Sequence, residues 1–437
     1  MDTTTETAYL GLFQEINSRL SSLDFMVRHR ETGKDFTRER RLTFIILIIF
    51  LLNLLKRSQQ DELDEFFKLL NGTEVAVRVV TKSALTQARK KLKYGAFVEL
   101  NRVQTDYFYQ SLQPQTWMGW RLLAVDGSTL QVPNTPENLA HFGAWHPAKG
   151  GPCPMARISQ MFDVLNQLTL DAIIGPKSVG ERELAAEHFA HLCSGDLVLL
   201  DRGYPAFWLF SLIRSKNAHF CARMKVSGWK VAKHFADSGL NEQIVSLQPG
   251  SAAKQECGKR QLSANPITIR LIRVELDDGE IEVLATSLLD KETYPISIFK
   301  ELYHLRWPVE EQYKLFKMRI EIENFSGKSV LAVYQDFHAK VLTANLTAIL
   351  ARPAQEVVTQ NSAEKKYLYR VNMTNALSKM KDTIVFLLHD LSLVPRMLMS
   401  LWQLMIKTSE PIRPGRSYPR IMRVKSKKFP VCYKPTR

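Results

Sequence analysis

Two aspartates occupy the same kind of position in this sequence, each directly after a short apolar run. Leu122-Leu123-Ala124-Val125 leads into Asp126, and Leu197-Val198-Leu199-Leu200 leads into Asp201. Burying a carboxylate without a partner is costly, so a cation or hydrogen bonds are expected at each. If both runs are neighbouring strands, their carboxylates share one sheet edge and form an oxygen site suited to Mg²⁺ or Mn²⁺. For Asp126 alone, an ordinary Asp-Gly turn is the competing explanation.

A hard oxygen site of this kind suits phosphoryl transfer, and that chemistry needs a third carboxylate. With two ions roughly 3.5 to 4 Å apart, one activates the attacking water or 3′-hydroxyl and the other stabilises the leaving oxygen. The best candidate for the third ligand lies in YHLRWPVEEQYKLFK, residues 303–317. The spacings of three, four and seven residues in this segment favour one helical face for its chemically active side chains, Tyr303, Arg306, Glu310 and Lys317.

Pro308 modifies this picture, because it predicts a new helix that starts there and carries Glu310 and Lys317. A carboxylate beside Arg and Lys fits a phosphodiester site, since the acid binds metal while the bases hold phosphates. A surface helix with ion pairs would explain the segment if it stood alone. Glu311 competes with Glu310 for the metal, and helix geometry does not choose between them.

The segment matches the motif Tyr-x2-Arg-x3-Glu-x6-Lys, and here the sequence resembles the insertion-sequence-four family of bacterial DDE transposases. In that family the motif follows two strand-borne aspartates, and its spacing selects Glu310 over Glu311. The resemblance covers nearly the whole chain, because four other segments are similar to family segments: TKSALTQARKKLKYGAF (81–97), LLAVDGSTL (122–130), LLDRGYP (199–205) and RPGRSYPR (413–420).

The resemblance implies cut-and-paste transposition of a bacterial insertion sequence. The enzyme would nick each element end, the freed 3′-hydroxyl would form a hairpin, water would reopen it, and the ends would join target DNA. By the same resemblance two Mg²⁺ ions, for which Mn²⁺ can substitute, would bind Asp126, Asp201 and Glu310. Phosphates near the cleaved end would be held by Tyr303, Arg306 and Lys317.

The implied partners are double-stranded DNA, at the terminal inverted repeats and the target, and a second copy in a homodimer on DNA. One departure concerns the hairpin step. Relatives known to form the hairpin carry a Trp just before the strand that matches Leu284-Ala285-Thr286, where it stacks on a flipped base, whereas this chain has Glu282. Trp229 or Trp307 could stack on a base instead, and each also suits a core position.

The charge balance favours a polyanionic partner. Lys and Arg number 59 against 44 Asp and Glu, a net charge of +15. Residues 413–437 carry nine Lys or Arg and no acid, which fits a DNA-binding tail or merely a solvated one. A basic helix over TKSALTQARKKLK, capped by Thr81 or Ser83, is typical of an element laid against DNA, although a solvated surface helix also fits. The DNA-contacting residues expected there are Arg89, Lys90, Lys91 and Lys93.

Two further features bear on location. The five cysteines lie far apart without a C-x-x-C pair, so neither a zinc site nor a disulfide framework is indicated. This pattern favours a reducing cytoplasm, where a DNA-acting enzyme would be associated with the nucleoid. The 14-residue run from Leu42 to Leu55 is shorter than the roughly 20 residues that span a bilayer, which predicts a buried core helix and no membrane partner.

The order of elements predicts an α/β protein with a ribonuclease-H-like core, a mixed sheet flanked by helices. An all-helical DNA-binding domain spans 1–112 and the first part of the core spans 113–220. A β-rich insertion with a hairpin at Asp277-Asp278-Gly279 spans 221–290. The second part of the core spans 291–365, and a helical C-terminal region with the basic tail spans 366–437.

Three other classes of protein compete with a transposase. A ribonuclease-H-like nuclease would use the same carboxylates and only hydrolyse. A catalytically silent DNA-binding relative would keep the basic segments without the chemistry. A membrane-associated protein would be built on residues 42–55.

Overall fold

The structure is a computed structural model that describes residues 3–146, 151–276 and 279–413. The chain divides into two compact units. Unit 1 comprises Met1–Pro114, Leu130–Ala156 and Lys314–Arg437, and unit 2 comprises Gln115–Thr129 and Arg157–Tyr313. Most of the basic C-terminal tail, from residue 414 onward, lies outside the described residues. The five-segment division expected from the sequence concerns domain boundaries and stays a prediction.

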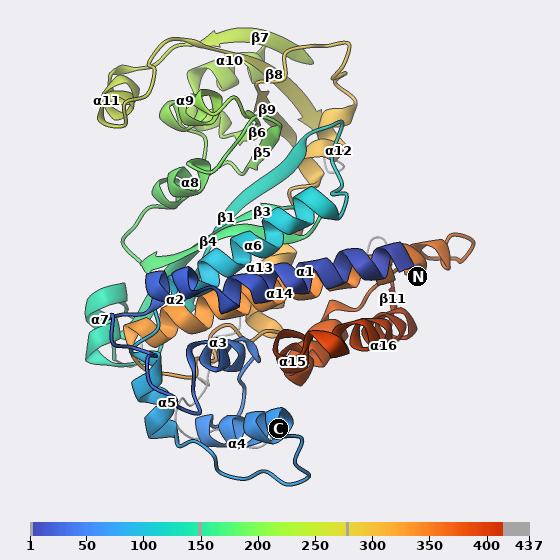
Figure 1. The fold of residues 1–437 in the computed structure, drawn as a ribbon. Helices are drawn as coiled ribbons and strands as arrows, with labels where there is room; N and C mark the ends of the chain where they lie inside the picture. Colours follow the sequence, from blue (N-terminus) through green and yellow to red (C-terminus); the bar gives the residue numbers. More distant parts are fainter. Residues whose placement is uncertain (1–2, 147–150, 277–278, 414–437) are drawn as a thin grey trace. The chain divides into compact units, whose positions relative to one another are not determined.

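Unit 1 is mainly helical. The long helix α14 contacts α3, α6, α15 and α16, while α1 packs on α6 and α16 (Figure 1). Helix α4 ends at Asn71, and Gly72 follows it as a left-handed cap with a φ of 61°. The helices of this unit are α1 (Thr3–Ser21), α2 (Leu23–His29), α3 (Phe44–Leu52), α4 (Gln59–Asn71), α5 (Lys82–Arg89), α6 (Gly95–Ser111), α7 (Pro136–Phe142), α14 (Val330–Gln360), α15 (Met373–His389) and α16 (Val394–Lys407).

The apolar run 42–55 forms α3 inside unit 1. Thr43 caps the helix by accepting a hydrogen bond from the backbone N–H of Ile46. Seven of its nine residues are buried, and Leu54 and Leu55 beyond its end are buried too. The prediction of a buried core helix is therefore confirmed. Over the described ranges, no helix is both long enough and apolar enough to cross a membrane.

A mixed sheet forms the centre of unit 2. Strands β1, β5 and β6 are parallel neighbours, and β9 continues the sheet antiparallel to β6. The full order is β2-β3-β1-β5-β6-β9-β8-β7, with β4 paired to β3. The strands are β1 (Arg121–Gln131), β2 (Ala144–Trp145), β3 (Cys153–Asp163), β4 (Leu168–Pro176), β5 (Asp196–Leu200), β6 (His219–Met224), β7 (Glu242–Leu247), β8 (Ile267–Glu275) and β9 (Ile281–Thr286).

The order β4-β3-β1-β5-β6, with helix α8 (Glu181–Phe189) before β5 and α9 (Phe207–Ser215) after it, is the ribonuclease-H-like arrangement. Strands β1, β5 and β6 are almost wholly buried over residues 122–125, 197–200 and 220–222. Such strands are covered on both faces, which explains their continuous apolar runs. The predicted fold class is confirmed.

The segment between β6 and β9 extends this same sheet. It contains α10 (Lys230–Asp237), β7, α11 (Ser251–Lys259) and β8, and both β7–β8 and β8–β9 pair antiparallel. Part of the hairpin predicted at Asp277-Asp278-Gly279 lies outside the described residues. The strands on either side of it are paired, with Glu275 opposite Ile281.

Candidate active site

The two strand-borne aspartates lie at the same edge of the sheet. In the parallel pair β1–β5, Leu122 is opposite Leu197 and Ala124 is opposite Leu199. This register brings Asp126 and Asp201 to equivalent positions, because each is two residues beyond the last of these pairs. Strand β1 continues through Asp126 to Gln131, so Asp126 is a strand residue. The alternative of an ordinary Asp-Gly turn is therefore wrong.

Glu310 comes from the helical segment that follows the sheet. Helix α12 (Ile298–His304) ends before Pro308, and α13 (Pro308–Met318) begins there, as the proline predicts. Arg306, in the connection, is nearly buried and its Nη2 lies 2.8 Å from Oε1 of Glu310. Tyr303, on α12, directs its hydroxyl to Asp201, with 3.5 Å between Oη and Oδ1. Both residues therefore contact a carboxylate of the site.

Asp201 has a basic partner that the sequence did not reveal. Arg223 on β6 places Nη2 3.0 Å from Oδ1 of Asp201, and its Nη1 pairs with Glu282 on β9. Because β6 is the parallel neighbour of β5, Arg223 reaches the same sheet edge. Glu282 thus pairs with an arginine that also pairs with Asp201.

The pKa of Asp126 is affected by the other two carboxylates of the site. Its pKa is raised to about 6, mainly by burial, with smaller contributions from the negative charges of Glu310 and Asp201. A hydrogen bond from the N–H of Gly127 and the positive charge of Arg306 oppose that increase. The three acids therefore share one electrostatic environment, in which the charged form of Asp126 is disfavoured. Perturbed carboxylates of this kind are concentrated at functional sites.

The donor set suits a hard divalent cation, because all three side chains offer carboxylate oxygens. Within the described ranges, however, no three His, Cys, Asp or Glu side chains are grouped closely enough to hold a metal ion. Two of the three acids are paired with arginines, Glu310 with Arg306 and Asp201 with Arg223. The carboxylate oxygens therefore suit a metal ion chemically, while Glu310 and Asp201 each have an arginine as their partner in this structure.

Glu311, the rival ligand, points to a different environment. Glu311 is exposed, whereas the side chain of Glu310 is only 20% exposed and pairs with Arg306. Glu310 is also among the charges that raise the pKa of Asp126. These observations favour Glu310 over Glu311, although the ligand role itself stays a prediction. Lys317 lies two turns beyond Glu310, in the part of α13 that belongs to unit 1, and its phosphate contact likewise stays a prediction.

Tyr313 is a site residue that the sequence interpretation missed. It follows Glu310 by one turn of α13, and its hydroxyl donates a 2.6 Å hydrogen bond to the backbone carbonyl of Asp126. The side chain is 7% exposed. This bond ties the helix of Glu310 to the strand of Asp126. The available signal was its position three residues after Glu310, which places both on one face.

A buried chain of polar groups reaches the same carbonyl. The hydroxyl of Ser159 lies 3.4 Å from the carbonyl oxygen of Asp126 and 3.0 Å from Nε2 of His188, whose Nδ1 lies 2.7 Å from Asp171. The side chains of Ser159, His188 and Asp171 are thus linked in this order by hydrogen bonds. Ser159 and His188 are fully buried, so a substrate does not reach them. We assign this network to support of strand β1.

The basic segment after Thr81 requires a correction. Thr81 caps α5 as expected, but the helix ends at Arg89 and does not continue to Lys93. Arg89 is 5% exposed and its guanidinium pairs with Asp336 at 2.8 Å within unit 1. It therefore belongs to the core, and its prediction as a DNA contact is wrong. The remaining hydrogen bonds of Arg89 go to Ser326, Ala332 and Gln335.

The lysines beyond the helix have different surroundings. Lys90 and Lys93 are exposed, while Lys91 lies 3.4 Å from Asp35. Leu92, between them, is buried and forms an isolated antiparallel bridge with Arg30. DNA contact by the three lysines stays a prediction.

The tryptophans considered for base stacking differ in exposure. Trp307, between α12 and α13, is 46% exposed. Trp229 packs against the core of unit 2 and stacks on Phe210, with ring centroids 6.3 Å apart. Of the two, Trp307 offers the larger open surface.

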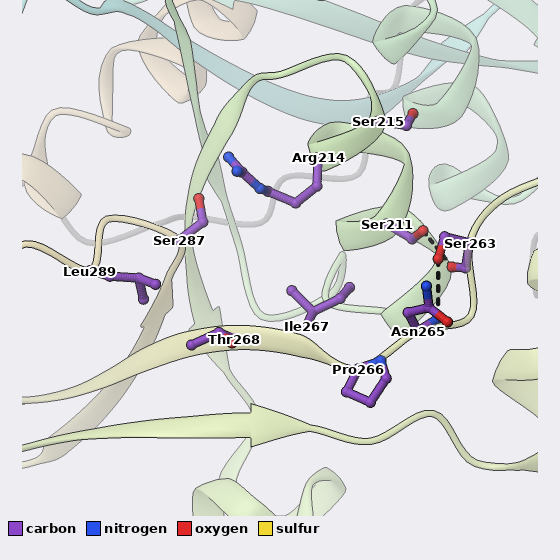
Figure 2. Close-up of a pocket in the computed structure, with 10 residues that line it drawn as sticks. All are labelled: Ser211, Arg214, Ser215, Ser263, Asn265, Pro266, Ile267, Thr268, Ser287 and Leu289. Carbon is purple, nitrogen blue, oxygen red and sulfur yellow. Dashed lines mark hydrogen bonds between the residues drawn. The ribbon is translucent and has the colours of Figure 1, made fainter.

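A separate pocket of about 420 Å³ lies at the other end of these strands (Figure 2). Arg214 follows β5 and precedes β6, and Ser287 follows β9, whose Thr286 pairs with Cys221 near the start of β6. The pocket therefore lies at the sheet edge opposite Asp201. It is not part of the carboxylate site.

Comparison with known proteins supplies the family. The family model described as "Transposase DDE domain" matches residues 117–346, more than half of the chain. The chain belongs to the DDE transposase family. Over 414 residues it is 22% identical to transposase InsG for insertion sequence element IS4 of Escherichia coli K12, covering 92% of this chain and 90% of that protein. The resemblance to the insertion-sequence-four family is thereby confirmed.

Other relatives are also transposases. The chain is 20% identical over 286 residues to the transposase for IS231F of Bacillus thuringiensis subsp. israelensis, covering 54% of this chain and 59% of that one. A solved structure of piggyBac transposase, in a synaptic complex with hairpin DNA, aligns at 12% identity with a TM-score of 0.42, covering 93% of this chain and 86% of that one. As a DDE transposase of the insertion-sequence type, the chain is a nuclease and transferase that acts on DNA, in a family that uses divalent metal ions.

Proposed function

We propose that this transposase performs cut-and-paste transposition, with Asp126, Asp201 and Glu310 as its metal-binding catalytic carboxylates. The observation that carries the proposal is geometric: the β1–β5 register brings Asp126 and Asp201 to equivalent positions at one sheet edge, and Tyr313 ties the helix of Glu310 to the strand of Asp126. Two bound Mg²⁺ ions, or Mn²⁺ in their place, would supply activation of the attacking oxygen and stabilisation of the leaving oxygen.

The basic and hydroxyl groups beside the carboxylates have a second task in this proposal. Arg306 presents a guanidinium that suits bidentate binding of a phosphate near the cleaved end. Burial and the charge of Asp201 raise the pKa of Tyr303, although Arg306 opposes this, so its hydroxyl stays a neutral donor. Lys317 would hold a more distant phosphate. Together the three position the scissile strand.

The hairpin intermediate also belongs to the proposal. Formation of the hairpin displaces a base, which needs a surface to stack on. Stacking on an aromatic face is worth about 1–3 kcal/mol. With Glu282 at the position where relatives have Trp, Trp307 is the candidate for this surface because of its exposure. Pairing of two element ends would use a homodimer on DNA.

The test uses purified protein, Mg²⁺, a labelled duplex that carries the terminal inverted repeat, and a target plasmid. The proposal expects nicks at the repeat boundary, a hairpin species on denaturing gels, and joined products. Cleavage without joined product would instead favour a nuclease that only hydrolyses. Binding to the repeat without any cleavage would favour a catalytically silent relative.

A further inference from the structure

A basic surface in unit 1 lies outside the catalytic site. It is formed by two segments, the connection between α2 and α3 and the short stretch after α5. Over residues 30–41 and 90–93 the chain carries eight Lys or Arg and three acids, a net charge of +5. The residues that define this basic surface are Arg30, Lys34, Arg38, Arg40, Arg41, Lys90 and Lys93.

Backbone pairing holds the two segments together. Arg30 and Leu92 form an antiparallel bridge, the N–H of Glu31 donates to the carbonyl of Lys91 at 2.9 Å, and the N–H of Lys93 donates to His29 at 2.8 Å. In Figure 1 the chain after α2 passes close to α5. The charges of both segments therefore belong to one surface.

Side chains fix the connection further along. Asp35 accepts hydrogen bonds from the N–H and the hydroxyl of Thr32, at 2.9 and 2.8 Å, and pairs with Lys91. The ring of Phe36 packs on Phe44 at the start of α3, with centroids 5.4 Å apart. Arg38 is three residues from Asp35, so their Cα atoms lie within about 11 Å. The arginines are thus carried by a connection that is anchored at both ends.

The charged side chains of this surface face solvent, although Lys93 also donates a 3.4 Å hydrogen bond to the backbone carbonyl of Arg28. Lys34, Arg38, Arg40, Arg41, Lys90 and Lys93 are all exposed. In the part of the chain that the structure describes, no carboxylate forms an ion pair with any of these six, whereas the lysine between the last two, Lys91, is paired to Asp35. The net charge of +5 that remains after the three acids are counted raises the local concentration of a polyanion.

We propose that the basic surface binds the phosphate backbone of double-stranded DNA without reading its bases. This inference rests on the proposed function, because that function supplies DNA as the partner. Arg38, Arg40 and Arg41 lie in the connection between α2 and α3. They are not on a helix that could enter the major groove, so they suit contacts with phosphates and not with base edges. The surface replaces Arg89 as the main basic contact of this region.

Salt dependence tests the proposal quantitatively. Each phosphate contact contributes about 0.9 to the slope of log affinity against log salt concentration. Replacing Arg38, Arg40 and Arg41 together by Gln should lower the slope by roughly 2.7 if all three bind phosphates. Affinity for a duplex of arbitrary sequence is measured between about 50 and 200 mM salt. Thermal melts of the variant verify that it is folded.

Two controls sharpen the measurement. Lys365→Gln with Lys366→Gln removes two exposed charges elsewhere in unit 1 and should leave the slope unchanged. Lys90→Gln with Lys93→Gln removes charge from the second segment of the basic surface and should lower the slope by roughly 1.8. A fall of the same size in the Lys365 control would mean that overall charge, and not this surface, sets the affinity.

The outcomes separate this proposal from the function on which it rests. A triple variant with the wild-type slope overturns the proposal and leaves the transposase function intact. A triple variant that loses binding only to anionic vesicles, with DNA binding unchanged, also overturns it. A wild-type chain that binds no duplex at all contradicts the proposed function itself.

Discussion

The hydroxyl of Tyr313 donates a 2.6 Å hydrogen bond to the backbone carbonyl of Asp126. The bond joins α13, which carries Glu310, to β1, which carries Asp126. Two carboxylates that are 184 positions apart in the sequence are thus held in register by a contact between the elements that carry them. Positioning of catalytic groups within fractions of an ångström has large effects on rate.

Replacing Tyr313 by Phe should slow cleavage without weakening DNA binding. The ring still fills its buried position, and the hydroxyl is lost with its hydrogen bonds to the carbonyl of Asp126 and to Gln160, each worth about 1 kcal/mol of net stability. We expect the less exact placement of Asp126 to raise the barrier by about 1 kcal/mol, which slows single-turnover cleavage about fivefold, because 1.36 kcal/mol corresponds to tenfold. Affinity for the repeat DNA should stay at the wild-type value.

Tyr94→Phe is the matched control, since that tyrosine is 39% exposed and belongs to unit 1. It should leave the rate unchanged. A Tyr313→Phe variant that cleaves at the wild-type rate would show that this hydrogen bond does not position Asp126.

Ser159 should prove structural despite its Ser-His-Asp surroundings. Ser159→Ala removes the group between His188 and the carbonyl of Asp126, which leaves a buried ring nitrogen without its partner. Such a loss costs about 1–3 kcal/mol, so the melting temperature should fall. Cleavage by the folded variant should stay within about tenfold of wild type. Complete loss of cleavage with normal stability would instead identify Ser159 as a direct participant.

Asp126 should make the chain less stable at neutral pH. Its pKa is raised to about 6, mainly by burial, so the ionised form penalises the folded state. This penalty is complete above about pH 6 and disappears below about pH 4, where the carboxyl is protonated in both states. Asp126→Asn should therefore be more stable than wild type at about pH 8, by roughly 2–3 kcal/mol.

Urea denaturation at both pH values measures the difference between the two proteins, in which the other titrating groups cancel. The advantage of Asp126→Asn should vanish near pH 4. Adding Mg²⁺ at pH 8 should stabilise the wild type more than the variant. An Asn variant that is less stable than wild type at pH 8 would contradict the electrostatic description of the site.

Arg89 and Lys90 are neighbours in the sequence with opposite expected behaviour. Arg89→Gln leaves Asp336 buried without its cation and should destabilise unit 1 by about 3–5 kcal/mol. Lys90→Gln lies on the surface and should change stability by at most about 0.5 kcal/mol. Thermal or urea unfolding of the two variants decides between them. Equal effects on stability would contradict the burial of Arg89.

The sequence predicted the elements whose signals are local. The apolar runs before Asp126 and Asp201 indicated buried strands, and Pro308 indicated a helix start, because each depends on adjacent residues. The 14-residue run was predicted as a core helix from its length alone. Its observed extent is shorter, Phe44–Leu52.

The misses come from contacts between distant parts of the chain. Arg89 was predicted as a DNA contact because its neighbours in the sequence are basic. Its actual partner, Asp336, is 247 residues away, so the local composition could not reveal the ion pair. Arg223 was missed for the same reason, since its reach to Asp201 depends on the pairing of β5 and β6. Tyr313 was within reach of a spacing argument from Glu310, but a buried tyrosine on a helix is ordinarily a core residue.

The identity of the third carboxylate is the central claim, and paired variants of Glu310 and Glu311 test it most directly. Both changes to Gln preserve size and remove one charge from adjacent residues of α13, so each controls for the other. In an end-cleavage assay with Mg²⁺ we expect Glu310→Gln to lose cleavage while binding the repeat DNA normally, and Glu311→Gln to cleave at close to the wild-type rate. Wild-type cleavage by Glu310→Gln, or its loss in Glu311→Gln alone, would contradict the assignment of Asp126, Asp201 and Glu310 as the catalytic carboxylates.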